Sequence, residues 1–298
     1  MMRVFLTGGT GYVGSAVLEA LVRHGHHVDA LVRNGEDAGR VQARGAHPIL
    51  GDLLNGASWR NAAAAADGAI HAAVDYTARQ RDVDAAAIDG LATLPPRAGR
   101  FLVYTSGIWV LGAAPQPIDE TAPVNPVELV SWRPAHELRV LATAAQGVRA
   151  IVVRPGIVYG GSRGIVGDQL RDAANSLVRI VGGGDNHWPL VYDRDLGELY
   201  ARLAGTADAA GVYHATDGGA ETVNEIVAAL ADHAPTQPSI RHVPLPEARK
   251  KMGPYADALA LDQIVHSPRA RALGWAPTLH SVAGNAARLL EEWRESRN

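Results

Sequence analysis

Cysteine is absent from the 298 residues, so disulfides, thiolate nucleophiles and cysteine-ligated metals are excluded. Lysine is nearly absent, because Lys250 and Lys251 are the only two. No apolar run approaches the ~20 residues that a membrane-spanning helix needs. There is no long run of charges of one sign, and the net charge of −3 argues against nucleic acid or an anionic membrane as a partner.

No secretion signal is expected, because the first residues already have the pattern of a strand. We therefore expect a cytoplasmic protein. Twelve histidines are present, but no His-x-x-x-His or Glu-x-x-His spacing is supported by further ligands, so we expect no metal site. The chain is 47% hydrophobic, which suffices for a sizeable core in one large domain or in a domain with a smaller lobe.

The sequence does have a glycine-rich stretch near its start. Residues 3–6 form an apolar run typical of a buried strand, and residues 15–22 carry apolar side chains at helical spacing. A strand, a glycine turn and a helix in this order favour a dinucleotide-binding loop over a glycine-rich turn without a ligand. In such a loop, glycine permits the tight turn, the approach of a diphosphate and close helix packing. We assign these loop residues to the cofactor site: Gly8, Thr10, Gly11, Tyr12, Val13 and Gly14.

A basic residue follows the second expected strand, residues 27–32. Arg33 lies nineteen positions after Gly14. Near this position an acidic residue would bind the ribose 2′-hydroxyl of NAD, whereas an arginine suits the 2′-phosphate of NADP. Arg33, together with Asn34, therefore predicts NADP(H) as the cofactor, with NAD(H) less favoured. The alternative is a solvated arginine at the end of a strand.

Two further strand ends contribute to the predicted cofactor site. A strand is expected at residues 47–50, and Asp52 after it is suited either to bond an adenine amino group or to cap the next helix. Another strand, residues 68–73, ends in small residues, as expected where a backbone lies against a cofactor. We add Asp52, Leu53, Ala72 and Ala73 to the cofactor site.

Strand and helix patterns alternate through the first half of the chain. Further strands are expected at residues 100–105 and 149–154, and helices at 81–94 and 135–145. The alternation predicts an α/β fold of the Rossmann type, with a doubly wound parallel sheet and a smaller C-terminal substrate-binding lobe. We expect a dinucleotide-binding domain at residues 1–159, with return elements at about 190–215, and a lobe formed by residues 160–189 and 216–298.

The second half is less regular. The expected elements there are a helix at residues 166–180, a helix at 196–203 capped by Asp195, a strand at 211–214, and amphipathic helices at 222–233 and 279–295.

Several motifs occur together in one order: TGGTGYVG at residues 7–14, GDL at 51–53, VYTS at 103–106, VLG at 110–112, VRPGIVYG at 153–160, VYDRDL at 191–196 and LGWAP at 273–277. With them the chain resembles the extended or atypical branch of the short-chain dehydrogenase/reductase superfamily, the NAD-dependent epimerase/dehydratase-like proteins. The resemblance implies that Pro155, Gly156, Ile157 and Val158 line the nicotinamide, with Thr105 and Ser106 nearby. It also suggests a homodimer formed through the helices at about 85–94 and 135–145.

The chemistry of this family is carried by a serine and a Tyr-x-x-x-Lys motif, and this motif is missing. Trp132 stands where the tyrosine is expected, and His136 stands where the lysine is expected. The usual serine position aligns with Gly107, which leaves Ser106 and Thr105 as the nearby hydroxyl groups.

The replacements change the proton chemistry. An indole N–H only donates, so Trp132 cannot act as a general base, although it could wall off the nicotinamide or stack on a substrate ring. His136 is able to carry a proton near neutral pH, or it only binds the nicotinamide ribose as the family lysine does. Tyr76, after the strand at 68–73, is another candidate proton donor. The structural alternative is that Trp132 packs in the core and His136 has no chemical role.

Three functions remain open from the sequence. The first is an NADP(H)-dependent oxidoreductase that moves a hydride to or from a small carbonyl or imine compound, with Ser106 polarising the oxygen and His136 or a lobe residue supplying the proton. The second is a non-redox epimerase, isomerase or dehydratase that uses the same pocket. The third is an NADP-binding sensor without catalysis. In each enzymatic case the partner is a small-molecule substrate, whose identity the sequence leaves open.

Overall fold

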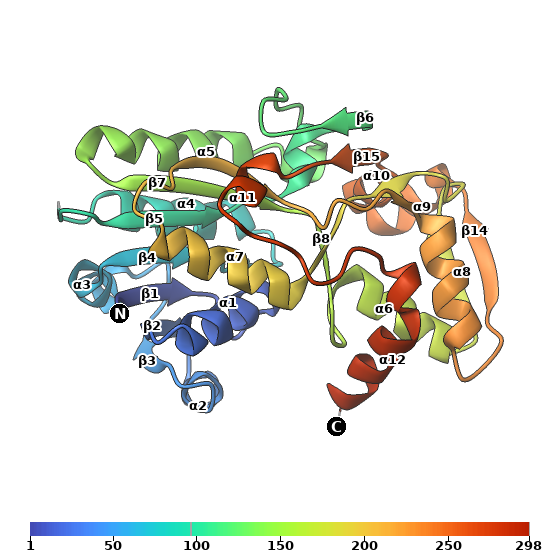
Figure 1. Ribbon diagram of the computed structural model, residues 1–298, viewed down its shortest axis with the longest axis horizontal. Coiled ribbons are helices and arrows are strands. Elements are labelled where there is room, and N and C mark those ends of the chain that lie inside the picture. Colours follow the sequence, from blue (N-terminus) through green and yellow to red (C-terminus); the bar gives the residue numbers. More distant parts are fainter. Residues whose placement is uncertain (96, 298) are drawn as a thin grey trace. The chain divides into compact units, whose positions relative to one another are not determined.

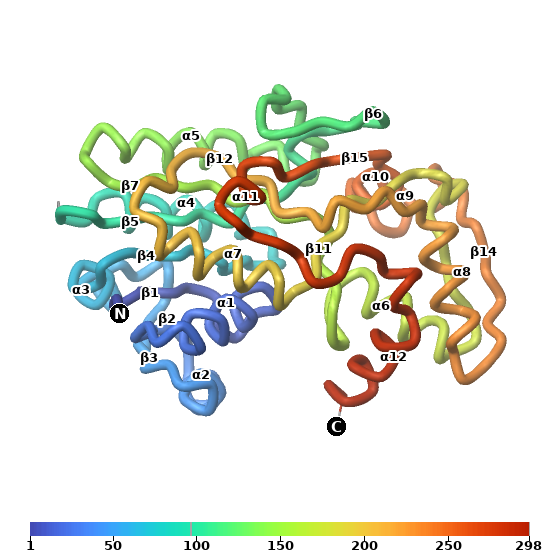
Figure 2. Tube along the Cα trace, in the orientation of Figure 1, coloured from blue at the N-terminus to red at the C-terminus, as the bar shows by residue number. Residues whose placement is uncertain are grey.

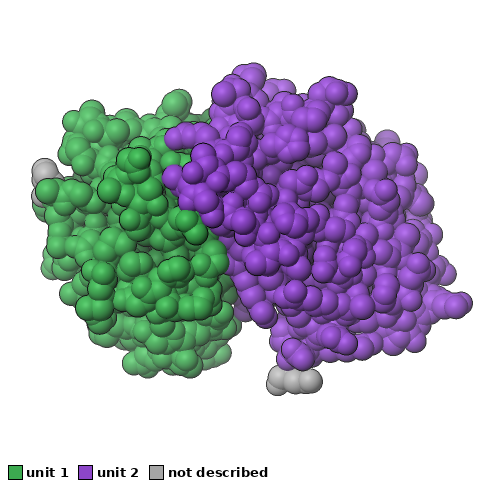
Figure 3. All heavy atoms as spheres, in the orientation of Figure 1, with its two compact units in different colours: residues 1–106, 132–154, 196–213 green, residues 107–131, 155–195, 214–298 purple. Residues whose placement is uncertain are grey.

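The structure is a computed structural model, and it describes residues 1–95 and 97–297. Its contacts divide the chain into two compact units, which Figure 3 colours separately. Unit 1 comprises residues 1–106, 132–154 and 196–213, and unit 2 comprises residues 107–131, 155–195 and 214–298. The predicted domain at 1–159 differs from unit 1 chiefly because residues 107–131 belong to unit 2. Residue 298, the last of the predicted lobe, lies outside the described residues.

A seven-stranded sheet forms the centre of the fold, in the order β12-β7-β5-β4-β1-β2-β3. Its strands are β1 (Arg3–Thr7), β2 (His27–Val32), β3 (His47–Leu50), β4 (Gly68–His71), β5 (Phe101–Thr105), β7 (Arg149–Pro155) and β12 (Gly211–Ala215). The pairings of β1 through β5 and of β5 with β7 are parallel. The strand order reverses beside β1, so the predicted doubly wound parallel sheet is confirmed, and ligands of such sheets bind at this reversal.

Helices flank the sheet, as Figures 1 and 2 show. They are α1 (Tyr12–Arg23), α2 (Gly35–Gln42), α3 (Arg60–Ala65), α4 (Gln80–Ala92), α5 (Arg133–Ala142) and α7 (Asp193–Gly205). The helices α1 and α7 run side by side, because a Cβ atom added at Gly197 would lie 2.5 Å from the carbonyl oxygen of Ala16. The core beneath the helices includes Phe5 and Trp59, whose rings stack with centroids 5.6 Å apart.

Unit 2 is built from short strands and helices. Its strands are β6 (Ala114–Ile118), β8 (Ile157–Tyr159), β9 (Leu177–Val181), β10 (His187–Trp188), β11 (Leu190–Tyr192), β13 (Glu221–Thr222), β14 (Ser239–Val243) and β15 (Gln263–Val265). Its helices are α6 (Gly164–Ala174), α8 (Val223–His233), α9 (Leu245–Met252), α10 (Pro254–Leu259), α11 (Pro268–Ala272) and α12 (Ala286–Glu295). These strands form two-stranded sheets. The core of the unit includes an apolar cluster in which both Trp188 and Trp293 are buried.

Three expectations for the second half are wrong. The predicted helix at 166–180 ends at residue 174, because Ser176 takes a positive φ of 66° and β9, whose residues alternate between buried and more exposed, pairs with β14. Asp195 lies inside α7 instead of capping it, and its carboxylate accepts hydrogen bonds from Thr278. The last helix begins at residue 286 instead of 279, because Glu221 binds the backbone N–H groups of residues 282 and 283.

The contact between Gly14 and Gly8 gives the first prediction. A Cβ atom at Gly14 would lie 2.0 Å from the carbonyl oxygen of Gly8, so we expect Gly14→Ala to lower the free energy of unfolding. Overpacking of this kind typically costs about 1–3 kcal/mol. Urea denaturation followed by circular dichroism measures the change.

Gly39→Ala is the matched control, because Gly39 lies in the helix α2 with open space around it. Removing a glycine from a helix interior should stabilise the protein by ~0.5–1 kcal/mol. Equal effects of the two substitutions would contradict the close contact.

Candidate active site

The glycine loop has the geometry that its sequence predicts. Gly8 has a φ of +79°, and a Cβ atom on it would lie 2.6 Å from the backbone of Ala72 and Ala73. The N–H of Gly11 donates to the carbonyl oxygen of Gly8 at 2.8 Å, and Gly11 then stands as the N-cap of α1. Because Gly11 has no side chain, no cap oxygen covers the first turn of α1. A helix start of this kind attracts an anion through its N–H groups and its positive dipole end.

A cleft of about 470 Å³ opens over this loop. Its walls include the carboxyl ends of β1, β2 and β4 and the loop after β3, so residues from four strand ends meet there. Of the predicted cofactor residues, the cleft is lined by Gly8, Thr10, Gly11, Tyr12, Val13, Arg33, Asp52, Leu53, Ala72 and Ala73. Tyr76 also lines the cleft, with 90% of its surface exposed. Cβ atoms on the loop glycines would fill space in this cleft, and an arginine lies at its side. Both features fit the diphosphate and ribose of a dinucleotide.

Arg33 is the exposed cation at the β2 side of the cleft, and the described residues give its guanidinium no hydrogen bond. Asp75 lies in the same cleft, where hydrogen bonds from Thr77 hold the pKa of its carboxyl below the ordinary value. The charges of Arg79 and Arg33 add to this lowering. The cleft therefore holds positive charge beside Asp75 and an arginine able to bind a phosphate.

Two residues predicted for the cofactor site accept hydrogen bonds from nearby backbone N–H groups. The carboxylate of Asp52 accepts the N–H of Leu54 at 2.8 Å, so Asp52 forms a local turn instead of capping the following helix. The side-chain oxygen of Asn34 accepts the N–H of Asp37 at 2.9 Å and caps α2, a helix that we did not predict. Asn34 therefore has a structural role and does not line the cleft.

Unit 1 contains a buried cluster that centres on Asp84 of α4. The Nδ1 atom of His136 lies 2.6 Å from one carboxylate oxygen, which also accepts the hydroxyl of Tyr104 at 2.9 Å. The Nε2 atom of His71 lies 3.1 Å from the other oxygen. The Nδ1 atom of His71 lies 2.6 Å from the hydroxyl oxygen of Thr7. Thr7, His71 and Tyr104 stand at the carboxyl ends of β1, β4 and β5, so the cluster occupies the ligand-binding edge of the sheet.

Trp132 is the N-cap of α5 and His136 lies in its first turn; these are the two residues predicted at the positions of the missing motif. The ring of Trp132 packs edge-on against that of His136, with centroids 4.9 Å apart. The guanidinium of Arg133 covers Trp132 and donates to the carbonyl oxygen of Thr105 at 2.9 Å, which ties α5 to the end of β5. The Nε2 atom of His136 has no hydrogen-bond partner within the described part of the chain, and the residue is 8% exposed.

The hydroxyl groups at the end of β5 differ in availability. The Thr105 hydroxyl is 2.7 Å from the hydroxyl of Tyr200, and it is therefore engaged. Ser106 is buried, and its Oγ atom has no partner among the residues that the structure describes. An unpartnered buried hydroxyl at this edge is suited to bind an oxygen of a ligand.

The predicted nicotinamide residues Pro155, Gly156, Ile157 and Val158 belong to unit 2. A Cβ atom at Gly156 would lie 2.6 Å from the carbonyl oxygen of Pro189, which explains the glycine. Ile157 and Val158 lie on β8, which pairs with β11 in parallel. Unit 2 thus determines their backbone geometry.

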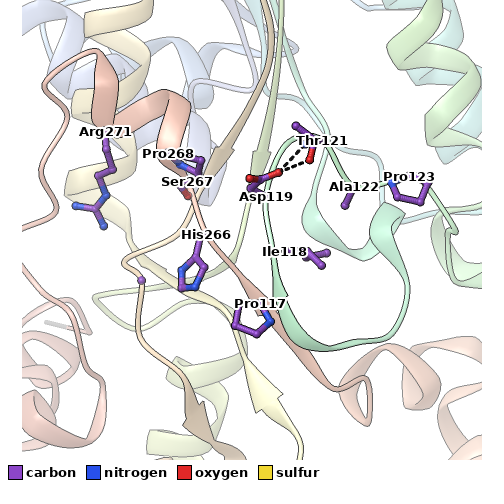
Figure 4. A pocket seen from close by; sticks show the side chains of 11 residues that line it. Pro117, Ile118, Asp119, Thr121, Ala122, Pro123, His266, Ser267, Pro268 and Arg271 are labelled. Atoms are coloured by element: carbon purple, nitrogen blue, oxygen red, sulfur yellow. Dashed lines mark hydrogen bonds between the residues drawn. The ribbon is translucent and has the colours of Figure 1, made fainter.

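Unit 2 also has a hollow of about 730 Å³, drawn in Figure 4. Its polar side chains include Asp119, His266 and Arg271. Hydrogen bonds from Thr121 hold the pKa of the Asp119 carboxyl below its ordinary value. The guanidinium of Arg271 donates to the carbonyl oxygens of Thr216 and Asp217, so the backbone holds it in place.

Several residues of the site have no local signal in the sequence. Asp84 and His136 are in contact although they lie 52 positions apart in the sequence. The ion pair between Glu137 and Arg154, with a distance of 2.6 Å, joins α5 to β7. Such long-range pairs have no local pattern. Tyr104 is fully buried, and desolvation together with the nearby Asp84 raises the pKa of its phenol.

No group of three or more His, Asp or Glu side chains is arranged to hold a metal ion among residues 1–95 and 97–297. In that same part of the chain, no helix is both long and apolar enough to cross a membrane.

Comparison with known proteins identifies the class. Residues 4–216 match the model of the NAD dependent epimerase/dehydratase family. The chain belongs to this family, which confirms the resemblance found in the sequence. It is 31% identical over 261 residues to the 4-hydroxy-2-methyl-3-oxo-4-farnesyl-3,4-dihydroquinoline-1-oxide ketoreductase of Stigmatella aurantiaca, covering 83% of this chain and 78% of the relative.

Solved structures share the fold. The dTDP-glucose 4,6-dehydratase of Bacillus anthracis in complex with NAD gives a TM-score of 0.83 at 16% identity, covering 100% of this chain and 98% of the other. Human epimerase family protein SDR39U1 with NADPH gives a TM-score of 0.73 at 18% identity, covering 97% and 99%.

Asp217 of unit 2 gives a prediction about pH. Burial raises the pKa of its carboxyl to about 6, against hydrogen bonds from Gly219 and Tyr159 that act to lower it. Since the folded pKa lies above the ordinary one, the protonated carboxyl stabilises the fold fully below about pH 4, and this contribution is lost as the pH rises through about 6. A rise of the pKa from its ordinary value of 3.8 to about 6 corresponds to a lost stability of about 3 kcal/mol.

We expect Asp217→Asn to remove this loss. In denaturant unfolding, the stability of the variant relative to the wild type should increase between about pH 4 and pH 7, where the folded and unfolded states differ in the protonation of this carboxyl. The same stability difference at both ends of the range would show that Asp217 does not titrate in this way.

Proposed function

We propose that this protein is an NADP(H)-dependent oxidoreductase of the atypical short-chain dehydrogenase/reductase type, acting on a small carbonyl or imine compound. The observation that carries the proposal is that one sheet edge holds both a glycine-lined cleft and a buried imidazole with an unpartnered Nε2 atom. The first feature fits a dinucleotide, and the second supplies a group able to carry a proton. The kinship with a protein named as a ketoreductase supports carbonyl reduction.

NADP(H) is the proposed cofactor in preference to NAD(H). Its support is Arg33, an exposed guanidinium in the cleft to which residues 1–95 and 97–297 give no hydrogen bond. The solved structure with NADPH, which shares the fold, is consistent with this choice, whereas the one with NAD is consistent with the alternative. A ribose 2′-phosphate would pair with Arg33, while the diphosphate would lie at the start of α1.

The side chains have separate roles in the proposed reduction. Bound NADPH would supply the hydride, two electrons with one hydrogen, to the carbonyl carbon and leave as NADP⁺. The carbonyl oxygen would accept a hydrogen bond from Ser106 and take its proton from Nε2 of the His136 imidazolium, which water then reprotonates. Trp132 would shield His136 from solvent on one side through its edge-on contact. The hydroxyl of Thr105 already has a partner in Tyr200, which favours Ser106 for this role.

Arg33→Ala tests the cofactor choice. We expect the affinity for NADPH to fall about 10-fold or more, since a charge-assisted bond to a phosphate contributes ~1.5–3 kcal/mol. The affinity for NADH should stay within about 2-fold, because NADH has no 2′-phosphate. Isothermal titration calorimetry measures both. Arg44→Ala is the control, because Arg44 pairs with Glu19 and does not line the cleft; an equal loss for both coenzymes would contradict the assignment.

His136→Asn tests the proton donor. We expect the rate of NADPH-dependent reduction to fall by ~10²–10⁴, the usual contribution of general acid catalysis. Binding of NADPH should be retained. The readout is the loss of NADPH absorbance at about 340 nm with a panel of ketones and imines.

The control is His24→Asn, which makes the same change at an exposed histidine that pairs with Glu198. A panel that leaves the absorbance of the wild type unchanged would contradict the oxidoreductase function. Normal turnover by His136→Asn would instead contradict only the role of His136.

Two alternatives predict different outcomes. A non-redox epimerase, isomerase or dehydratase would convert its substrate without a net change in NADP(H) absorbance. An NADP-binding sensor would bind the coenzyme without turnover, a possibility favoured by the missing Tyr-x-x-x-Lys motif. The buried hydrogen-bonded imidazole favours an enzyme over a sensor, because binding alone does not require it.

A further inference from the structure

The carboxylate of Asp84 is buried and receives hydrogen bonds from three different elements of unit 1. One oxygen is shared by His136 of α5 and Tyr104 of β5, and the other faces His71 of β4. A buried carboxyl group is stable in such a place only when donors satisfy its oxygens. These three donors meet that requirement.

The arrangement determines where the protons lie. An ionised carboxylate only accepts, so the nitrogens that face Asp84 must carry hydrogen: Nδ1 of His136 and Nε2 of His71. The Nδ1 atom of a neutral His71 is then an acceptor, and Thr7 donates its hydroxyl hydrogen to it. The only ring atom of a neutral His136 left to take up a proton is Nε2. Burial alone would raise the pKa of Asp84, but the bonds from His136 and His71 hold it well below its ordinary value.

We propose that Asp84 is a positioning residue for His136: its carboxylate holds Nδ1–H, so that Nε2 exchanges the proton, and its charge stabilises the imidazolium. The inference rests on the proposed role of His136 as the proton donor. Thr7 fixes His71, and His71 and Tyr104 hold the carboxylate in this orientation. Residues of β1, β4 and β5 are thereby linked to His136, the proton donor.

The other charged groups near the cluster either neutralise each other or favour an ionised Asp84. Around Asp84 and His136, the titratable and charged groups are His71 on β4, Tyr104 on β5, Arg133 and Glu137 on α5, and Arg154 on β7. Glu137 and Arg154 neutralise each other through two hydrogen bonds. The charge of Arg133 favours an ionised Asp84. Asp84 is therefore the carboxylate that bonds His136 directly.

A measurement on the unmodified protein tests the orientation without any substrate. In protein labelled with ¹⁵N-histidine, the nitrogen resonances of His136 are assigned by their loss in His136→Asn. We expect neutral His136 to be protonated at Nδ1, with Nε2 bare. Protonation at Nε2 instead would overturn the proposal, and this outcome does not depend on whether any Asp84 variant folds.

Asp84→Asn tests the charge, because the amide oxygen is still able to accept Nδ1–H. We expect NADPH binding to change less than about 2-fold, and the pH midpoint above which reduction declines to move down by ~1–2 units. The midpoint of the His136 nitrogen titration should move in the same direction. Asp89→Asn is the matched control, since Asp89 also lies on α4 and pairs with Arg139 of α5 at the surface.

The outcomes separate this inference from the proposed function. If His136→Asn abolishes reduction while Asp84→Asn leaves both midpoints where they were, His136 is the acid and Asp84 does not position it. If His136→Asn reduces normally, the proposed function of His136 fails. Movement of both midpoints in Asp84→Asn, but not in Asp89→Asn, supports the positioning role.

Discussion

A backbone contact that only glycine permits sets the geometry of this protein. Gly14 lies so close to Gly8 that a Cβ atom would come within 2.0 Å of its carbonyl oxygen. The contact holds the start of α1 against the end of β1, at the point where the strand order of the sheet reverses. The cleft forms over this point, and the ends of β2 and β4 and the loop after β3 bring their residues to it. The position of every proposed cofactor contact in unit 1 follows from that packing.

The second constraint is the buried carboxylate of Asp84. Trp132 and His136 lie at the start of α5, where the family resemblance predicts a tyrosine and a lysine. A histidine on its own is free to rotate and to exchange tautomers. Burial beside Asp84, with His71 and Tyr104 completing the shell, removes that freedom. His136 and Asp84 thus form an imidazole–carboxylate pair at the ligand-binding edge of the sheet.

Local patterns predicted most of the sheet, and long-range contacts account for what they missed. The glycine spacing predicted the loop, and apolar runs predicted the strands from β1 to β5, because both signals lie within a few residues. Residues 177–180 were predicted as the end of a helix, since their apolar side chains fit either period and only the pairing of β9 with β14 decides. Asp84 carried no signal, because its partners lie 13 to 52 positions away. Asn34 was predicted as a cofactor contact, and the structure adds a local hydrogen bond by which it caps α2, a helix that was not predicted.

A crystal structure with NADPH tests the central claim most directly, because the claim concerns where a phosphorylated nucleotide lies on this chain. The account predicts that the diphosphate lies over Gly8–Gly14 at the start of α1, that the 2′-phosphate contacts Arg33, and that Nε2 of His136 faces the nicotinamide side. A diphosphate bound anywhere else on the protein, or a 2′-phosphate away from Arg33, would contradict it.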